Sequence, residues 1–436
     1  MFICPNCGGN LKFDIPSQQL GCEYCNTLMD VYSFEDKSET GVLSSDYDAT
    51  IFTCPQCAGE IISTDTSAAE FCSFCGASAI LHSRLTKEKR PSYIIPFQKT
   101  KEDCKKAYSD MMKKAIFAPD ALKNPKYIDG FRGIYMPYWA FHLTQEDSFS
   151  LKGSRSKQRG DYIYTDHYAL TGEISAHYNG LSYDAASSFD DNISEKVAPF
   201  DVKGMKTFTP AFLSGFYADT ADVDASNYEE KAKQIAISHS QNAIYKEFSG
   251  ITIDMQTPLN IDTQVKEIDS AMFPVWFMSY RNAGRVAYAT VNGQTGKVVA
   301  DLPIDSQKYA KGSLLLAIPI FLLFNLLFTI TPFALLVITA ILGIISIIIY
   351  SAEITSIKKK EPIQTKKSAL VSSISAIVLC VIVGILQPVN DIFYYGAAII
   401  SLSAIFYSFK DIIEYYNILA TRRLPQFDRT GGDDRA

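Results

Sequence analysis

Residues 369–387 read ALVSSISAIVLCVIVGILQ and include no charged side chain. Three similar apolar runs occupy residues 313–331, 332–350 and 391–409, and no charged residue lies in their interiors. As a helix, each run is about 28 Å long, which is enough to cross the hydrocarbon core of a bilayer. A helix in the core of a soluble protein usually keeps one polar face, and these runs show none. The sequence therefore predicts four membrane-spanning helices.

The four runs are arranged as two transmembrane hairpins, at residues 312–350 and 369–409. Tight turns without Lys or Arg join the runs within each hairpin, whereas the loop at residues 351–368 carries five lysines. Lysine and arginine stay on the cytoplasmic side of a membrane. We therefore expect this loop, both chain termini and residues 1–311 to be cytoplasmic. Residues 410–436 predict an interfacial helix followed by a disordered tail.

Ten cysteines occur in the chain, and eight of them form four Cys-x-x-Cys pairs near its start. Because a reducing cytoplasm disfavours disulfides, paired cysteines there indicate a metal. Two modules, residues 1–35 and 51–81, each carry two pairs separated by fourteen residues, and the flanking sequence repeats as well. The predicted metal ligands are Cys4, Cys7, Cys22, Cys25, Cys54, Cys57, Cys72 and Cys75.

This spacing is typical of β zinc ribbons that hold one structural Zn²⁺ each. Two thiolates on a tight turn occupy two corners of a tetrahedron, and a second turn supplies the other two. Gly8, Asn26 and Gly76 tolerate the left-handed backbone that such turns need. Four thiolates leave no open position for a substrate, so we expect the zinc to stabilise the modules. The pattern resembles the zinc ribbons of transcription-factor-B type.

The charge of the ribbons argues against nucleic acid as their partner. Residues 1–81 hold two basic and eleven acidic side chains, which would repel phosphate groups. Binding of a protein is the better interpretation. The polar segments at residues 36–50 and 82–92 are interpreted as an acidic and a basic linker around the second ribbon.

Residues 93–305 predict an α+β cytoplasmic domain. Helical periodicity covers residues 100–117 and 227–248, and each helix leads towards a strand with one of the two tryptophans, Trp139 and Trp276. Because a Pro-x-Trp motif and a hairpin occur in both halves, we interpret the domain as a diverged duplication. The first hairpin has a basic tip at Lys152, Arg155, Lys157 and Arg159.

The sequence offers no support for catalysis. The five histidines lack metal-ligand spacing, and no phosphate loop, dinucleotide fingerprint or nucleophile elbow occurs. Asp190 and Asp191 lie in a polar stretch that is typical of a solvated turn. Cys104 has lysine neighbours, but its place on an apolar helix face favours an inert core thiol. We therefore predict that the protein is not an enzyme.

The order of the motifs resembles a family of bacterial, largely Firmicute, zinc-ribbon membrane proteins. The resemblance rests on the tandem Cys-Pro-x-Cys ribbons, Pro-Tyr-Trp139, Phe-Pro-Val-Trp276 and the hairpin sequence VNGQTGKVV at residues 291–299, followed by C-terminal spans. It implies a link with band-7 (flotillin-like) and phage-shock-type envelope-stress systems.

Three functions remain as alternatives. We favour a zinc-binding membrane scaffold that recruits cytoplasmic or membrane proteins to the bilayer, in an envelope-stress assembly as the resemblance implies. The second alternative is a membrane-tethered nucleic-acid-binding or transcription-related protein, which the acidic ribbons disfavour. The third is a small channel or transporter, for which an oligomer would have to create a polar path between the apolar spans. The identity of the partner and the oligomeric state, including a homo-oligomer, stay open.

Overall fold

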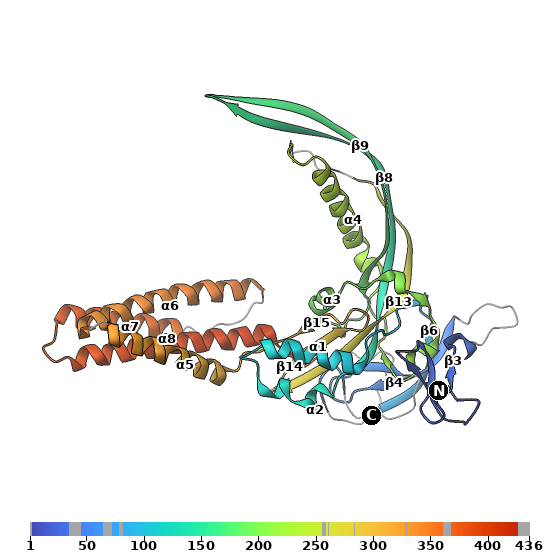
Figure 1. Cartoon of the computed structure of the whole chain (residues 1–436), viewed down its shortest axis with the longest axis horizontal. Helices are drawn as coiled ribbons and strands as arrows, with labels where there is room; N and C mark the ends of the chain where they lie inside the picture. Colours follow the sequence, from blue (N-terminus) through green and yellow to red (C-terminus); the bar gives the residue numbers. More distant parts are fainter. Residues whose placement is uncertain are drawn as a thin grey trace.

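The protein consists of a sheet domain, a helix bundle on one side of it and a long projecting hairpin (Figure 1). The bundle is formed by the C-terminal part of the chain, which then returns to the sheet domain. The computed structural model describes residues 2–34, 45–63, 72–77, 82–254, 259, 261–282, 284–327, 330–360 and 368–425.

Two long antiparallel strands, β8 (Arg132–Arg159) and β13 (Thr263–Asn282), organise the sheet domain. They pair through continuous runs of buried aromatic and β-branched residues, as is typical of strands covered on both faces. β9 (Tyr162–Asp184) returns along β8 after a two-residue turn, in which Gly160 has a φ of 63° that favours glycine. β14 (Arg285–Asn292) pairs with β13 on the edge opposite to β8.

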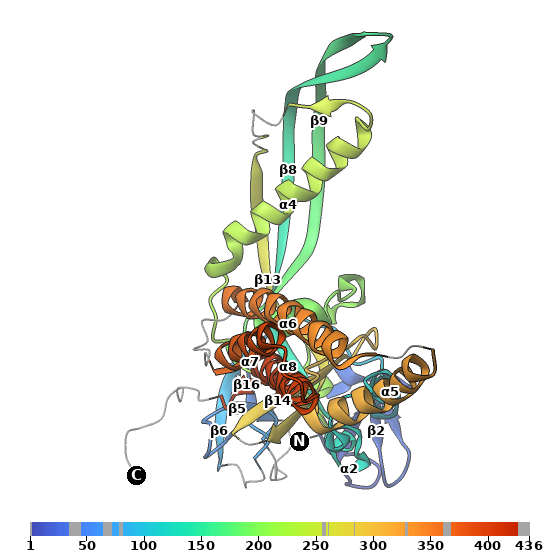
Figure 2. The same ribbon diagram turned by 90° about the vertical axis from the view of Figure 1, so that its left-hand side faces the viewer.

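Shorter elements complete the sheet domain. Its helices are α1 (Lys101–Lys114), α2 (Pro125–Ile128), α3 (Asp191–Val197) and α4 (Ser226–Glu247), with the 3-10 helices η2 (Asp120–Lys123), η3 (Val202–Gly204) and η4 (Pro210–Leu213). Its shorter strands are β7 (Tyr93–Ile94), β10 (Lys206–Thr207), β11 (Tyr217–Ala218), β12 (Thr252–Ile253) and β15 (Val298–Ala300). The helices expected at residues 100–117 and 227–248 are confirmed as α1 and α4, and α4 lies along the long hairpin (Figure 2).

The two tryptophans make equivalent hydrogen bonds around the β8–β13 pair. Trp139 Nε1 donates to the carbonyl oxygen of Val223, just before α4, at 2.8 Å. Trp276 Nε1 donates to the carbonyl oxygen of Lys99, just before α1, also at 2.8 Å. Each indole therefore fixes the segment that leads into one of the two long helices of the domain.

Backbone hydrogen bonds repeat the same arrangement. Ala185, directly after β9, donates its N–H to the carbonyl oxygen of Pro137 at 2.8 Å. Gly293, directly after β14, donates to that of Pro274 at the same distance. Both prolines lie two residues before a tryptophan, so the two halves of the domain have matching geometry at this point.

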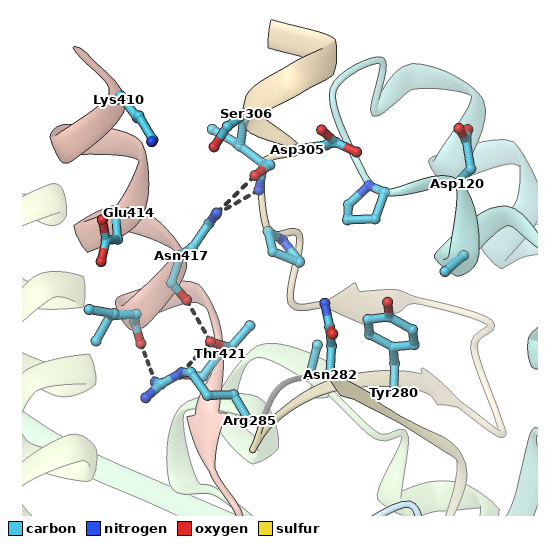
Figure 3. Close-up of a pocket in the computed structure, with 16 residues that line it drawn as sticks. Asp120, Tyr280, Asn282, Arg285, Asp305, Ser306, Lys410, Glu414, Asn417 and Thr421 are labelled. Atoms are coloured by element: carbon cyan, nitrogen blue, oxygen red, sulfur yellow. Dashed lines mark hydrogen bonds between the residues drawn. The ribbon is translucent and has the colours of Figure 1, made fainter. Parts of the chain in front are cut away.

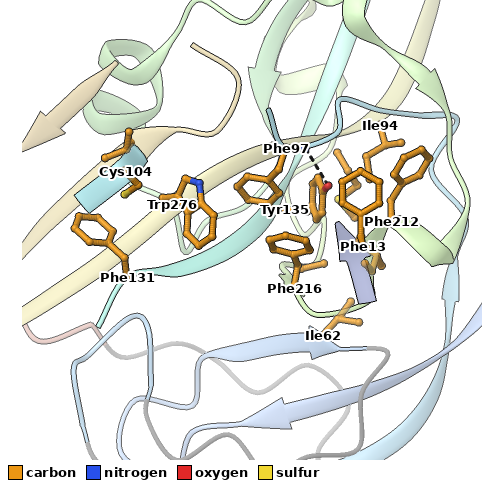
Figure 4. Packing of buried hydrophobic residues seen from close by; sticks show 14 of the residues in the cluster. Phe13, Ile62, Ile94, Phe97, Cys104, Phe131, Tyr135, Phe212, Phe216 and Trp276 are labelled. Carbon is orange, nitrogen blue, oxygen red and sulfur yellow. Dashed lines mark hydrogen bonds between the residues drawn. The ribbon is translucent and has the colours of Figure 1, made fainter. Parts of the chain in front are cut away.

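The core of the sheet domain is an aromatic cluster (Figure 4). The rings of Phe97 and Phe216 are stacked with centroids 4.5 Å apart, and Trp276 lies 5.0 Å from Phe97. Phe13 from the first ribbon packs against Phe212, with the ring centroids 5.2 Å apart. Because aromatic rings bury large apolar areas, this cluster holds the first ribbon against the sheet domain.

The first ribbon keeps a three-stranded sheet of its own. Its elements are β1 (Leu11–Asp14), β2 (Gln19–Cys22), β3 (Leu28–Met29) and the 3-10 helix η1 (Val31–Phe34). The strands occupy the fourteen-residue spacer and its surroundings, where the sequence predicts a short hairpin.

The second ribbon is part of the main sheet. Its strands β4 (Asp46–Thr53) and β5 (Glu60–Ser63) pair with each other, and β6 (His82–Lys89) pairs along the whole of β4. The interpretation of residues 36–50 and 82–92 as linkers is therefore wrong where the structure describes them as strands. The start of β4 alternates acidic and apolar residues, and this strand period was hidden by the acidic composition. Residues 35–44 lie outside the described part of the chain.

The described part of the C-terminal region contains four helices. They are α5 (Ser306–Leu327), α6 (Pro332–Lys360), α7 (Ser368–Leu386) and α8 (Ile392–Ala420). Three of them, α6, α7 and α8, are long and apolar enough to cross a membrane. The first predicted span, at residues 313–331, includes residues 328 and 329, which lie outside the described ranges. The loop predicted at 351–368 begins as helix, because α6 continues to Lys360.

Hydrogen bonds between small polar side chains join the helices of the bundle. Ser373 on α7 and Ser408 on α8 lie 2.8 Å apart between their Oγ atoms. Tyr350 on α6 donates its hydroxyl to the buried carboxylate of Asp411 on α8, at 2.7 Å. Such contacts are typical of helix association in membranes, where apolar side chains gain nothing by leaving lipid.

Helix α8 runs without interruption to Ala420, so the interfacial helix expected after the last span is the C-terminal part of α8. Of the apolar residues expected on its membrane face, Ile413 is buried and Tyr416 is 42% exposed. After α8, β16 (Arg422–Arg423) pairs with β14. Residues 426–436, which include the expected disordered tail, lie outside the described part.

Arg422 fixes the chain to the sheet domain after α8. Its guanidinium donates two hydrogen bonds to Asp190, at 2.9 and 3.0 Å, and also pairs with Asp301. It lies over the Tyr288 ring, 5.4 Å from the centroid. Asp190 was expected in a solvated turn, but it caps the N-terminus of α3 and binds Arg422. Burial raises the pKa of Asp190, yet the hydrogen bonds and charge of Arg422 lower it below the usual range overall.

We predict that Arg422→Gln destabilises the junction between α8 and the sheet domain by about 2 kcal/mol, because Asp190 and Asp301 then share a half-buried site without a cation. The midpoint of thermal unfolding of the full-length protein in detergent should fall. Arg423→Gln, on the same short strand but exposed, is the control and should leave the midpoint nearly unchanged. An equal effect of both substitutions would contradict the role of Arg422.

Candidate metal centres

The eight predicted cysteine ligands form two compact groups of four. In each group the Sγ atoms all lie within 4.8 Å of one another. The Sγ–Sγ distance is 3.6 Å for Cys4–Cys25, 3.4 Å for Cys7–Cys22, 3.8 Å for Cys54–Cys75 and 3.6 Å for Cys57–Cys72. The two Cys-x-x-Cys pairs of each ribbon, which lie fourteen residues apart in sequence, are thus brought together.

These distances fit a tetrahedral zinc ion. Zinc–sulfur bonds of about 2.3 Å place the thiolates about 3.8 Å apart. A disulfide would need sulfurs at about 2.05 Å, and all eight cysteines are free. Both groups could therefore hold a metal ion, and four thiolates favour zinc. When bound, the metal would cross-link the two turns of each ribbon and so stabilise the ribbon.

Each Cys-x-x-Cys pair sits on a turn with the same backbone hydrogen bonds. In the first turn, the N–H of Cys4 donates to the carbonyl oxygen of Gly9 at 2.8 Å, and that of Gly8 donates to Cys4 at 2.9 Å. The residue directly after the second cysteine of each turn has a left-handed backbone, with φ between 55° and 73°. These positions are Gly8, Asn26, Ala58 and Gly76. The expectation for the first, second and fourth is confirmed, whereas alanine at the third gave no signal in the sequence.

The two groups differ in exposure. Cys7 and Cys25 of the first ribbon are exposed, whereas all four cysteines of the second ribbon are buried. The second ribbon is covered by β13 and β14, because Tyr288 donates its hydroxyl to the carbonyl oxygen of Phe74 at 2.8 Å. The ring of Phe74 also packs 6.4 Å from that of Phe277. Loss of the second metal would therefore disturb the main sheet, while loss of the first would act locally.

Hydrogen bonds lower the pKa of one thiol in the first ribbon and of two thiols in the second, which favours the thiolate that binds metals. A hydrogen bond from the Thr27 side chain lowers the pKa of Cys25 to about 6. In the second ribbon, a hydrogen bond from the Cys72 thiol lowers the pKa of Cys54 to about 6. Metal ligation requires the thiolate, so both shifts favour binding.

The other residues considered in the sequence have structural surroundings. Cys104 on α1 is fully buried, and burial raises its pKa, so the prediction of an inert core thiol is confirmed. Among the described residues, no histidine belongs to a group that could hold a metal. His142, on β8, lies 3.2 Å from the carboxylate of Asp269 on the neighbouring strand β13.

A cavity of about 710 Å³ lies where the helix bundle meets the sheet domain (Figure 3). Asn417 on α8 exchanges two hydrogen bonds with the backbone of Ile304, at 2.7 and 2.8 Å. Arg285 donates to the carbonyl oxygens of Ile418 and Thr421, at 2.6 and 2.5 Å. Because the last carbonyl groups of a helix lack partners within it, Arg285 satisfies the end of α8. These polar groups join two parts of the chain, and we assign no ligand to the cavity.

A second cavity, of about 200 Å³, contains a buried carboxyl group. Asp219 accepts hydrogen bonds from the Ser188 hydroxyl and from the backbone N–H of Thr220. Burial raises the pKa of Asp219 to about 7. With both carboxyl oxygens hydrogen-bonded to the protein, Asp219 holds β11 against the segment after β9.

We predict that Cys72→Ser and Cys25→Ser have unequal effects on stability. Each variant should lower the zinc content of the purified full-length protein from about two ions per chain to about one, since one of four thiolates is lost. Cys72→Ser should lower the thermal unfolding midpoint of the sheet domain, whereas Cys25→Ser should leave most of it intact. Elemental analysis and thermal unfolding measure the two effects.

Cys104→Ala is the matched control for these variants, because it removes a buried thiol outside both groups and should leave about two zinc ions bound. Zinc contents that do not respond to either ligand substitution would show that the groups do not bind this metal.

We predict that Asp219→Asn flattens the dependence of stability on pH. Since the pKa of Asp219 is raised in the folded state, its contribution is fully present below about pH 4 and is lost as the pH rises towards about 7. Because the variant lacks this loss, its unfolding midpoint should rise relative to that of the original protein between about pH 5.5 and pH 8. Zinc stays bound over about this range. Parallel pH profiles of the two proteins would contradict the prediction.

Comparison with known proteins gives a relative that aligns with most of this chain. The chain is 30% identical over 313 residues to the uncharacterized protein YdjG of Bacillus subtilis (strain 168). The match covers 71% of this chain and 92% of that protein. No family model and no solved structure matches the chain. With a match of this extent, the chain belongs to the protein family of Bacillus subtilis YdjG.

Proposed function

We propose that this protein is a zinc-containing integral membrane scaffold that recruits cytoplasmic protein partners to the bilayer. The observation that carries the proposal is the exposed apolar surface of the first ribbon. The side chains of Ile3, Tyr24 and Leu28 are 57%, 79% and 52% exposed on this small module. The second ribbon, in contrast, is enclosed by the main sheet. Aromatic and aliphatic side chains are the residues that protein interfaces bury at their centre.

The connection between the ribbons and the helices supports a scaffold. Phe13 holds the first ribbon in the aromatic core, and Arg422 holds the end of α8 on the same domain. A partner bound at the first ribbon would therefore keep a defined position relative to the membrane helices. A flexible tether would not provide this.

We propose four spans, with α5 as the first. The described part of α5 after Lys311 carries no charge, and the run continues without charge to residue 331. The lysines between the second and third spans would lie in the cytoplasm, and so would both termini and residues 1–311. The ribbons would then face a reducing compartment in which four thiolates keep a metal.

The matching halves of the sheet domain support a diverged duplication. In the antiparallel register, Pro137 lies opposite Met272 and Pro274 lies opposite Tyr135, which relates the halves by a local two-fold axis. The parallel neighbours also correspond. β7 pairs with β13 beside Met272, and β11 pairs with β8 beside Tyr135. We assign this duplicated unit an architectural role and no catalysis.

The class of partner comes from the resemblance noted in the sequence. It favours a band-7 (flotillin-like) or phage-shock-type protein in an envelope-stress assembly. Nucleic acid is disfavoured, because the acidic residues of the ribbons would repel its phosphates.

We predict that a variant with Tyr24→Ser and Leu28→Ser loses its partner while it keeps both metals. The full-length protein would be captured from gently solubilised membranes of its host, and proteins that copurify would be identified by mass spectrometry. We expect enrichment of a band-7 or phage-shock-type protein, and a decrease of about tenfold in the variant, as expected for loss of one or two well-buried anchor residues.

Leu85→Ser is the matched control, because Leu85 is 84% exposed on β6, outside the first ribbon. It should leave the captured protein unchanged. Equal capture by all three proteins would show that the first ribbon is not part of the binding surface. Enrichment of nucleic-acid-binding machinery instead would favour the alternative function, a membrane-tethered nucleic-acid-binding protein.

A further inference from the structure

The hairpin of β8 and β9 extends beyond the rest of the sheet domain. β13 pairs with β8 only as far as Gln145, whereas β8 and β9 stay paired to Arg159 and Tyr162. Figure 1 shows that the distal part of the hairpin bends towards the side on which the helix bundle lies. Its tip thus projects alongside the bundle and apart from it.

One face of the distal hairpin alternates tyrosines with basic residues. In an antiparallel sheet, directly opposed residues and those two positions apart share a face. Arg159 is paired with Tyr162, and Lys157 with Tyr164, so all four side chains lie on the same face. The charged and aromatic residues on this face are Arg155, Lys157, Arg159, Tyr162, Tyr164, Asp166 and Tyr168, and Asp166 is paired with Arg155.

The same face is covered by α4 nearer to the sheet domain and is open at the tip. Leu151 and Leu170 are paired on it and pack against Ile244 of α4. α4 ends at Glu247, and the tip lies beyond this end (Figures 1 and 2). There, the side chains of Tyr162 and Tyr164 are 73% and 58% exposed. Packing against other described residues therefore does not explain why these two rings lie at the tip.

We propose that the hairpin tip is a second membrane contact, which inserts its tyrosines into the interface of an anionic bilayer, the same bilayer that α6, α7 and α8 cross. The proposal rests on the membrane crossing proposed above. It goes beyond that crossing, because it assigns a lipid-binding role to a segment of the sheet domain.

The chemistry of the tip fits an anionic lipid surface. Tyrosine is enriched at the boundary between headgroups and acyl chains, where its ring is apolar and its hydroxyl stays hydrated. Residues 152–168 contain four Lys or Arg against two Asp, although the whole chain has a net charge of −6. Each basic residue close to an anionic leaflet strengthens binding by about fivefold.

The direction of the hairpin selects a bilayer over a soluble partner. A bilayer crossed by the bundle is a plane perpendicular to its helices, and this plane continues past the bundle on all sides. The distal hairpin bends towards that plane (Figure 1). The bilayer is present wherever the helices are inserted, so the tip can reach it without the diffusion and binding step that a soluble partner needs.

Tryptophan fluorescence in bilayers with brominated acyl chains tests the proposal. Tyr162→Trp adds one indole at the tip, and the original protein, with Trp139 and Trp276 inside the sheet domain, gives the background. The full-length protein would be reconstituted in brominated phosphatidylglycerol. We expect quenching of more than about half of the added emission, together with a blue shift. A second protein would combine Tyr162→Trp with Arg155→Gln, Lys157→Gln and Arg159→Gln. In this protein, the ratio of inserted to free tip should be lower on the order of a hundredfold than with Tyr162→Trp alone.

Two further variants separate this inference from the proposed membrane crossing. Phe406→Trp lies on the exposed surface of α8 and should be quenched if the helices cross the bilayer. Tyr24→Trp lies in the first ribbon, on the far side of the sheet domain from the bundle, and should not be quenched (Figure 1).

Quenching of Phe406→Trp without quenching of Tyr162→Trp would overturn the role of the tip, and a protein or nucleic-acid partner would then be the next candidate. Absence of quenching in both would overturn the membrane crossing itself. Equal quenching of Tyr162→Trp in brominated phosphatidylcholine and phosphatidylglycerol would overturn the contribution of the basic residues.

Discussion

The antiparallel pairing of β8 with β13 is the constraint on which the rest of the structure depends. The two strands are joined at fourteen paired positions, with one shift of register between Val265 and Glu267. Each strand carries a tryptophan whose indole N–H binds the segment before a long helix. A buried indole that lost this bond would leave an unsatisfied donor. The positions of α1 and α4, and with them the aromatic core and the support of the long hairpin, therefore follow from this one pair of strands.

The two ribbons differ in how they pack against the sheet domain. The second ribbon contributes strands to the main sheet, and its cysteines are closed off from solvent by β13 and β14. The first ribbon rests on the aromatic core through Phe13, with two cysteines and several apolar side chains in solvent. The same small module thus serves once as part of the fold and once as a surface. This asymmetry, with the Arg422 contact to the helices, is what makes a membrane-held docking module physically reasonable.

Sequence patterns with a strict local cause were predictive. Cysteine spacing identified both groups of four, because a tetrahedral site needs two tight turns at short range. Helical periodicity located α1 and α4 to within a few residues. Amino-acid composition was a poor guide where it indicated a linker but the alternation of residues was that of a strand. The acidic start of β4 and the basic stretch of β6 were interpreted as linkers, although both pair as strands. The helix expected after the last span is the end of α8, and its apolar face is partly buried and partly exposed. An apolar helical face fits a membrane surface and a protein core equally well, and only its packing partners distinguish the two.

The sequence by itself determined the ligand sets of the two ribbons and the apolar helices of the C-terminal region. These features depend on side-chain chemistry and on spacings of a few residues, which a linear chain displays directly. Only the tertiary structure decided that Asp190 and Asp301 meet Arg422, and that the tyrosines and basic residues of the hairpin share one open face. The first grouping depends on contacts between residues more than a hundred positions apart, and the second depends on the register of the hairpin strands. No local pattern encodes them, because the free energy that selects them comes from packing the whole sheet domain.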